Sequence, residues 1–440
     1  MKRFLFVLAL VLVTFPCARP AAAQSLPHDG DVIVIFREGV DVGQRDRAVR
    51  GVGATVRRHF HTVAATAARL PDVAARQFLE QHPEVVAVIP DRPVRAHAKP
   101  AGGSGSAGQV VPAGVQRIGA APGNLGFTGL GIGVAVADTG LDFTHADLTP
   151  LGSACFTAFS SCADDNGHGT HVGGIIAARN NARDVVGVAP DATPYAVKVL
   201  DSAGNGTDST VMGGLDWVAT NGANLVPPIR VVNMSLGRAG QLNDNPALRA
   251  IVQTLYNQGI TVVVSAGNEP DLEVSQQVPA TYPEVLAIAS STALDGSNGR
   301  CRFFTGIIAA DSASSFTTDG RFDPATGIGV TVSAPGEDRE NVTRSCFAQS
   351  VGILSTKLGG GTTRLFGTSM AAPHAAGVVA LMWEKTLLLN SAGLLHPEDA
   401  RATLRAKAAL VGEAPLDAPT TGYSFDGERE GILSAPSVLQ

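Results

Sequence analysis

The order of apolar and polar positions divides this chain into a short first part and a long second part. Residues 31–97 combine strand-like runs at 31–36 and 85–89, patches of β-branched residues between 55 and 70, and a helix-like stretch at 72–81 that opens with an aspartate. Strand-like runs separated by a helix-like stretch are typical of a mixed unit. The pattern therefore predicts a small α+β domain in the first part.

From residue 109 onward, apolar runs rich in Val and Ile alternate with helix-like stretches. The expected strands are residues 132–137, 195–200, 230–235, 261–265, 285–289 and 329–333. The expected helices are residues 169–178, 208–219, 246–257 and 369–385. Near-continuous apolar strands are buried on both faces, and their alternation with helices indicates an α/β fold with a doubly wound, mostly parallel sheet. In such sheets, ligands bind beyond the carboxyl ends of the strands.

The first residues carry the features of a targeting segment. Two basic residues precede an apolar run at 4–13, and three alanines follow at 21–23. These features describe a secretory signal peptide, which we place at residues 1–23. The apolar run is shorter than the roughly 20 residues of a membrane-spanning helix, so we expect no membrane anchor. A lipoprotein site at Cys17 is the alternative interpretation of this segment.

Composition adds the domain boundaries. The chain has 440 residues, of which 45% are hydrophobic and 16% charged, and this is enough for a large core and more than one domain. The Gly- and Ser-rich stretch 101–108 is flexible by composition. We therefore expect a domain at 24–97, a linker at 98–108 and a second domain at 109–440. No Lys/Arg cluster has the character of a nucleic-acid surface, so no nucleic-acid partner is expected.

Four cysteines remain once a signal peptide is removed, and an even number in an exported chain suggests disulfides. Proximity in sequence favours a Cys155–Cys162 pair, which leaves Cys301 and Cys346 for the second. Four reduced, buried thiols are the alternative.

Four residues that could carry chemistry stand at ends of the expected strands and helices. Asp138 directly follows one strand, His168 precedes a helix between two glycines, Asn268 follows another strand, and Ser369 begins the longest helix. Each alone could be an ordinary turn or capping residue. Their joint occurrence in this order is specific, because a serine needs a neighbouring base to become a nucleophile. His168 with His171 could instead hold a metal, although the H-E-x-x-H pattern is absent.

Six stretches of the second part resemble the subtilase family of serine proteases. They are VAVADTGLDFTHADL (134–148), NGHGTHVGGIIAA (166–178), VGVAPDATPYAVKVL (186–200), VVNMSLG (231–237), VVVSAGNE (262–269) and FGTSMAAPHAAGVVALM (366–382). Residues 31–97 resemble the subtilisin propeptide-inhibitor family more loosely. The resemblance implies a subtilisin-like fold and a secreted serine endopeptidase made as an autoprocessed zymogen.

The resemblance also implies a role for each candidate residue. Ser369 would be the nucleophile, His168 the general base and then acid, and Asp138 the group that orients the imidazole. The Asn268 amide and the Ser369 N–H would bind the oxyanion. The order Asp, His, Ser along the chain is that of the subtilisin triad.

Substrate recognition is implied at two strands and one pocket wall. Two segments would pair with an extended peptide, as exposed strand edges do: Gly204, Asn205 and Gly206, and Ser235, Leu236 and Gly237. A third segment, Ser265, Ala266 and Gly267, would form a wall of the pocket for the residue before the cut. Its small residues lead us to expect a broad or hydrophobic preference.

A structural calcium site is also implied by the resemblance. The matching positions are side chains of Gln109, Asp147 and Asn181 and main-chain carbonyls of Arg179, Arg183 and Val185. An all-oxygen ligand set suits Ca²⁺.

The resemblance makes residues 24–97 a propeptide that acts as intramolecular inhibitor and folding template. Cleavage would fall within 98–108. A permanently attached accessory domain is the alternative. We expect polypeptide substrates and a monomer. The rival functions are a binding protein on an inactive protease fold, a serine esterase, and an exported structural or adhesive protein.

Overall fold

The computed structural model describes residues 30–101, 108–157, 161–389, 394–418 and 426–440. The predicted signal peptide lies outside the described residues, as do residues 102–107 of the predicted linker. Among the residues described, none of the helices combines the length and the apolar character needed to cross a membrane.

The first part of the chain is an antiparallel sheet of order β2-β3-β1-β4 with two helices. Its elements are β1 (Asp31–Phe36), α1 (Val42–Gly51), β2 (Thr55–His59), β3 (Ala65–Arg69), α2 (Val73–Glu80) and β4 (Val85–Pro90). The aspartate before α2 caps it, because the Asp72 carboxylate accepts the N–H of Ala75 at 2.8 Å. Helix α1 was not expected. It is polar and begins with a capping box between Asp41 and Gln44.

The second part is built on a seven-stranded sheet of order β16-β15-β13-β11-β7-β9-β8. All its described strand pairs are parallel. The strands are β7 (Gly133–Asp138), β8 (Ser153–Cys155), β9 (Thr193–Lys198), β11 (Ile229–Met234), β13 (Thr261–Ser265), β15 (Val285–Thr292) and β16 (Val330–Glu337). The predicted fold class is confirmed: the sheet is parallel and carries helices on both faces.

Alternate residues of each strand face the two helical layers. Val134 and Val136 of β7 pack with one group of helices, whereas Ala135 and Ala137 pack with the other. The first layer contains α3 (Ala113–Arg117), α4 (His168–Ala177), α7 (Thr368–Leu389), α8 (Pro397–Lys407) and α9 (Ala435–Leu439). The second contains α5 (Asp208–Asn221) and α6 (Pro246–Asn257). Within the described ranges the chain also forms two 3-10 turns, η1 (Gly222–Asn224) and η2 (Val274–Gln276).

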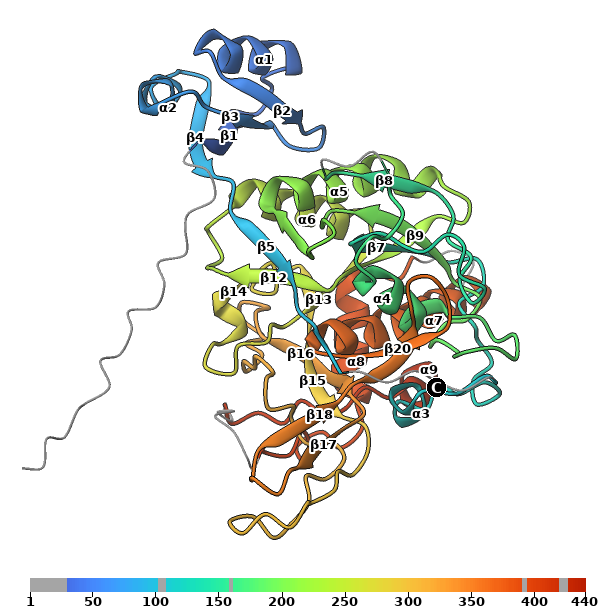
Figure 1. Ribbon diagram of the computed structural model, residues 1–440. Helices are drawn as coiled ribbons and strands as arrows, with labels where there is room; N and C mark the ends of the chain where they lie inside the picture. Colours follow the sequence, from blue (N-terminus) through green and yellow to red (C-terminus); the bar gives the residue numbers. More distant parts are fainter. Residues whose placement is uncertain (1–29, 102–107, 158–160, 390–393, 419–425) are drawn as a thin grey trace, which may run out of the picture.

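The α+β unit sits on the layer formed by α5 and α6, above these helices in Figure 1. Ile33 and Phe60 of the unit are fully buried in the same apolar cluster as Leu215 of α5. The carboxylate of Asp216 accepts the N–H groups of His61 and Thr62 at 3.0 and 2.7 Å. The unit and the large sheet therefore share one continuous core.

A tail leaves this unit and crosses the carboxyl-end edge of the large sheet, visible as the blue strand β5 in Figure 1. Strand β5 (Pro93–Ala96) lies between β10 (Asn205–Thr207) and β12 (Leu236–Ala239), and β12 also pairs with β14 (Gln277–Val278). The next strand, β6 (Lys99–Pro100), pairs with β20 (Thr362–Phe366). Residues 93–100 are thus held by strands on both sides of residue 97.

Disulfides close two loops of the second part. Cys155–Cys162 and Cys301–Cys346 are both formed, which confirms the predicted pairs. Cys346 lies in the turn between β17 (Arg339–Val342) and β18 (Ala348–Val351). Strand β19 (Ile353–Thr356) follows and pairs with β20.

Candidate active site

Four predicted residues reach the carboxyl-end edge of the sheet from different elements. Asp138 is the last residue of β7, and Asn268 follows the end of β13. His168 is the first residue of α4, and Ser369 is the second residue of α7. These are the strand and helix ends at which the sequence placed them.

The imidazole of His168 is paired with the carboxylate of Asp138. His168 Nδ1 lies 2.7 Å from Asp138 Oδ1, which also accepts the N–H of Thr139 at 2.7 Å. The side chains are 5% and 0% exposed. Burial opposes protonation of His168, but the charge and hydrogen bond of Asp138 outweigh it, so the pKa of His168 is raised above its usual value. The carboxylate therefore favours the imidazolium and fixes which ring nitrogen carries the proton.

Two donors converge on the main-chain carbonyl oxygen of His97. Asn268 Nδ2 donates to it at 2.8 Å, and the N–H of Ser369 donates at 3.3 Å. Asn268 Oδ1 accepts the N–H and hydroxyl of Thr368 at 3.0 and 2.9 Å, which turns the NH₂ group towards His97. A side chain at Gly367 would overlap the His97 carbonyl oxygen, so this position needs a glycine. The arrangement polarises one peptide carbonyl of the tail.

The hydroxyl of Ser369 donates to the carbonyl oxygen of Ser235 at 2.9 Å. Within the described chain, His168 Nε2 is buried and has no hydrogen-bond partner. The hydroxyl of Ser235 in turn donates to the Ser369 carbonyl at 2.8 Å. In a helix that carbonyl would bond to the N–H four residues on, but Pro373 has none, so Ser235 takes the place of that donor.

The tail pairs with both predicted substrate segments. Val94 and Arg95 of β5 lie opposite Gly206 and Asn205, and Ala96 lies opposite Leu236. Arg95 also lies opposite Gly237. Two hydrogen bonds extend the pairing: the N–H of Ala96 donates to the Gly204 carbonyl at 3.1 Å, and the N–H of His97 donates to the Ser235 carbonyl at 3.3 Å. An extended peptide therefore already occupies the strand edges that were expected to bind one.

The predicted pocket wall contacts the tail through one side chain. Ser265 Oγ lies 3.0 Å from His97 Nδ1. The N–H of Ala266 bonds instead to the Ile288 carbonyl, and the N–H of Gly267 bonds to Thr368 Oγ1 at 3.3 Å. Within the described residues, Ser265 is thus the member of this wall that hydrogen-bonds the residue before the polarised bond.

Comparison with known proteins decides the family. A model of the subtilase family matches residues 129–427. Subtilisin E of Bacillus subtilis (strain 168) is 33% identical over 390 residues, which cover 87% of each chain. Subtilisin Savinase of Lederbergia lenta is 38% identical over 279 residues, which cover 63% of this chain and 86% of the relative.

The chain belongs to the subtilase family. Subtilases are serine endopeptidases that act on polypeptides, and this protein is one of them. The predictions of family and enzyme class are therefore confirmed.

The alternative of a metal between His168 and His171 is not supported in this subtilase. His171 Nε2 lies 3.0 Å from the Ile353 carbonyl, and burial lowers the pKa of His171 to about 3. It is a neutral core histidine. Across the described residues, no group of three or more His, Cys, Asp or Glu side chains could hold a metal ion.

The positions implied for calcium lie together around one carboxylate. Asp147 Oδ2 accepts the N–H of Val185 at 3.0 Å, whereas Asp147 Oδ1 is buried and has no hydrogen-bond partner in the described chain. Gln109 Nε2 donates to the carbonyls of Arg179 and Val185 at 2.8 and 3.3 Å. Asn181 Oδ1 accepts the N–H of Arg183 at 3.0 Å. The unsatisfied carboxylate oxygen and the oxygen-rich surroundings fit a hard cation.

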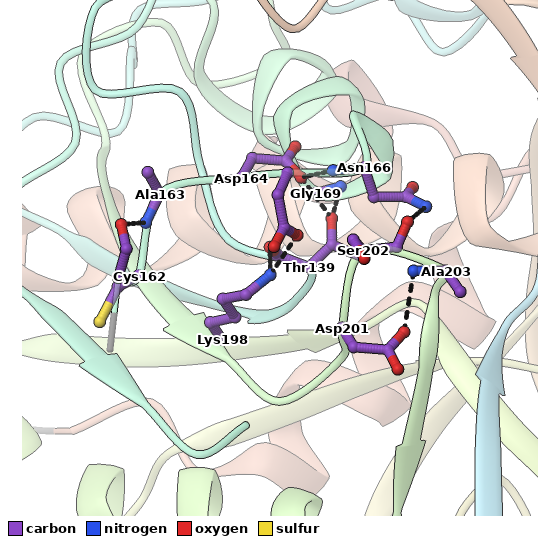
Figure 2. A network of polar contacts seen from close by, with 12 residues as sticks. Thr139, Cys162, Ala163, Asp164, Asn166, Gly169, Lys198, Asp201, Ser202 and Ala203 are labelled. Carbon is purple, nitrogen blue, oxygen red and sulfur yellow. Dashed lines mark hydrogen bonds and ion pairs between the residues drawn. The ribbon is translucent and has the colours of Figure 1, made fainter. Parts of the chain in front are cut away.

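Asp164 is a site residue that sequence analysis did not single out. Its carboxylate accepts the Thr139 hydroxyl at 2.8 Å, and the N–H and hydroxyl of Thr170 at 2.8 and 2.6 Å. It also accepts the N–H groups of Asn166 and Gly167 at 3.0 and 2.9 Å. Figure 2 shows this carboxylate beside Thr139 at the start of α4. Asp164 thus ties the residue after Asp138 to the helix that carries His168.

A lysine lies beneath the same network. Lys198, at the end of β9, is fully buried; its ammonium group donates to the Thr139 carbonyl and pairs with Asp165 at 2.6 Å. Asn166 Nδ2 reaches the Ser202 carbonyl at 2.9 Å, as Figure 2 also shows. In the sequence, the one sign of this network is that Asp164 and Asp165 stand just before His168.

Proposed function

We propose that this subtilase is a secreted zymogen that cuts peptide bonds through Asp138, His168, Ser369 and Asn268, and that its first substrate is its own His97–Ala98 bond. One observation carries the proposal: the carbonyl oxygen of His97 accepts from both Asn268 and the N–H of Ser369. A peptide bond held in this way has the position of a substrate about to be attacked.

The first half of the reaction forms an acyl-enzyme. The Ser369 hydroxyl rotates from the Ser235 carbonyl towards His168 Nε2, which takes its proton as the oxygen attacks the carbonyl carbon of His97. Negative charge develops on the carbonyl oxygen, where Asn268 and the Ser369 N–H donate to it. Asp138 stabilises the imidazolium. The C–N bond then breaks, and His168 gives the proton to the amine of Ala98.

The second half releases the acid. Water takes the place of the departed amine, His168 removes its proton, and the hydroxide attacks the ester carbon. Collapse of the second intermediate returns the proton from His168 to the Ser369 oxygen. The enzyme is regenerated and the product ends in a carboxylate at residue 97.

Residues 24–97 act as an inhibitory propeptide in this proposal. The tail occupies both substrate strands, and the α+β unit shares a buried core with α5. Cutting one bond removes neither contact, so the propeptide would stay bound until it is degraded. The cut after residue 97 falls at the boundary expected between the domain and its linker. Export would depend on the signal peptide predicted at residues 1–23.

Calcium would be held by the residues grouped around Asp147. Its free carboxylate oxygen, the amides of Gln109 and Asn181, and the carbonyls of Arg179, Arg183 and Val185 would supply oxygen ligands. The Gln109 amide would have to turn its oxygen inward. The positive charges of Arg179 and Arg183 oppose binding unless their side chains point away. When bound, the ion would stabilise the loop after α4.

Digestion of a mixed peptide library by the purified mature protein tests the activity. Mass spectrometry of the products is expected to show internal cuts, which the same mature preparation does not make after a covalent serine-protease inhibitor has blocked Ser369. Hydrolysis of small esters without any peptide cleavage would contradict the proposal and favour an esterase. Binding of peptides without cleavage would favour an inactive binding protein.

A further inference from the structure

The residue before the polarised bond fills a pocket that is polar on one side. The His97 side chain is 7% exposed, and its Nδ1 lies 3.0 Å from Ser265 Oγ. The ring also lies against the main chain of Gly237, where an added Cβ would come within 2.6 Å of His97 Cε1 and 3.2 Å of Nε2. The imidazole thus contacts both a hydroxyl group and a position that carries no side chain.

The surroundings of His97 favour the neutral ring. Burial and the nearby His168 lower its pKa to about 4, while a hydrogen bond with the Gly237 main chain acts weakly in the other direction. Of the titratable groups in the described part of the chain, His168 is the one whose charge acts on this ring, and no carboxylate is paired with it. A neutral imidazole has one donor and one acceptor nitrogen, so it can match the Ser265 hydroxyl in either tautomer.

We propose that this pocket is a specificity site for a neutral imidazole, and that the peptidase favours histidine before the cut bond, with Ser265 as the residue that selects it. This inference rests on the proposed function and names the substrates of the same site. It replaces the broad or hydrophobic preference expected from the small size of the pocket residues. A leucine of similar size would leave the Ser265 hydroxyl without a partner, and unpaired buried polar groups are costly.

The proposal predicts that cleavage of peptides with histidine before the cut bond depends on pH in a way that cleavage of other peptides does not. A free histidine has a pKa near 6.5, whereas the ring in the pocket stays neutral down to about 4. Binding of the substrate's histidine side chain in the pocket is therefore fully favourable above about pH 6.5. Its apparent affinity falls about tenfold for each pH unit below that value. Protonation of His168 affects all substrates alike. The ratio of the kcat/KM values of two substrates thus isolates the effect of the residue before the cut.

The test uses the mature enzyme obtained by self-processing and the peptide PVRAHAKP, copied from residues 93–100, beside a second peptide with leucine in place of the histidine. At about pH 8 the expected ratio of kcat/KM, histidine over leucine, exceeds one, and Ser265→Ala lowers it roughly 3- to 10-fold. The matched variant Ser437→Ala in α9 keeps the wild-type ratio. Below pH 6.5 the wild-type ratio is expected to fall.

Faster cleavage of the leucine peptide, or a ratio that is the same at all pH values, would overturn the proposal. So would a Ser265→Ala enzyme with the wild-type ratio. If that variant fails to mature, the pH dependence of the wild-type ratio still decides. If neither peptide is cut, the proposed function itself fails; if only the leucine peptide is cut, the endopeptidase stands and the specificity is wrong.

Discussion

At the scale of single residues, the proposed chemistry depends on a few hydrogen bonds around the carbonyl group of His97. Asn268 contributes a side-chain donor whose direction is fixed from the other end by Thr368. The N–H of Ser369 contributes the second donor. Because both are in place before the reaction, neither has to reorganise as charge develops.

Removal of the amide tests this arrangement. Asn268→Ala is expected to lower kcat roughly 100- to 1,000-fold with a much smaller change in KM, since the lost donor acts mainly on the oxyanion. Steady-state kinetics on a peptide substrate would measure both constants. The control is Asn341→Ala, which removes an asparagine in β17, outside the site. An equal loss in both variants, or a change in KM alone, would contradict the assigned role.

The pH dependence of kcat tests the imidazole. His168 must be neutral to accept the serine proton, so kcat falls as pH decreases through its pKa in the enzyme–substrate complex. Because Asp138 raises the pKa of His168 above 6.5, the midpoint of this fall is expected above pH 6.5. The measurement needs a peptide without titratable groups. A midpoint well below pH 6.5 would show that the histidine is not stabilised as imidazolium.

Sequence placed the four catalytic candidates at the correct strand and helix ends because those positions follow from local patterns. It could not select Asp164 over the neighbouring Asp165. The two carboxylates look alike in sequence, and only the approach of Thr139 from another element distinguishes them. The contact between His97 and Ser265 joins residues 168 positions apart and was equally invisible.

At the scale of elements, the site depends on how β7 and α4 are fastened together. The carboxylate of Asp164 binds Thr139 after the strand and the main chain at the start of the helix. In the described part of the chain, its hydrogen bonds go to residues other than Asp138 and His168, and its charge helps to raise the pKa of His168, so we regard it as a positioning residue.

Asp164→Asn is expected to lower kcat roughly 10- to 100-fold, because it loosens the relative placement of acid and imidazole. The same variant should move the acid midpoint of the kcat profile to lower pH, because the lost Asp164 charge helps to raise the pKa of His168, whereas a purely structural defect would leave the midpoint in place. Asp165→Asn is the matched control and should have a smaller effect, since Asp165 is partly exposed and pairs with Lys198. Identical profiles for wild type and Asp164→Asn would contradict a positioning role.

Elements with strong local patterns were predicted closely, and others were not. Strand β13 and helix α6 have the expected bounds, because one is a run of Val between polar ends and the other is an amphipathic stretch after an Asn cap. Helix α1 was missed since five of its ten residues are charged or polar and only Val42, Ala48 and Val49 are apolar besides two glycines. Hairpin β17–β18 was missed because its strands are short and it is held by a disulfide to residue 301.

At the scale of the whole molecule, the proposed calcium site would join segments that are distant in the sequence. Along the chain, Asp147 precedes α4 and Val185 follows it, and Gln109 lies near the start of the second domain. A bound ion would link all three.

Removal of calcium with EDTA is expected to lower the Tm of the mature protein. The loss corresponds to about 2.7 kcal/mol when free Ca²⁺ had been at 100 times its Kd. Asp147→Asn keeps an acceptor for the Val185 N–H but lacks the charge, so its Tm should no longer respond to calcium. The control Asp417→Asn removes an exposed carboxylate and should respond as wild type does. A wild-type Tm that is independent of calcium would contradict the site.

In the full-length precursor, the tail of the first domain occupies the proposed active site. The α+β unit, its tail and the large sheet form one structure. In it, two donors hold the His97 carbonyl, and strands pair with the tail on both sides of residue 97. Sequence suggested the two domains and a cut within residues 98–108. The proposed cut at the 97–98 bond rests on the register of β5 and β6 against the peptidase domain.

Self-processing of the full-length precursor tests the central claim most directly. Wild type and Ser369→Ala are expressed alone, and each product is analysed by intact mass and N-terminal sequencing. The wild type is expected to yield a chain that begins at Ala98, while Ser369→Ala remains uncut and folded. A Ser369→Ala precursor that matures like wild type, or a wild type whose first cut lies at another bond, would contradict the account.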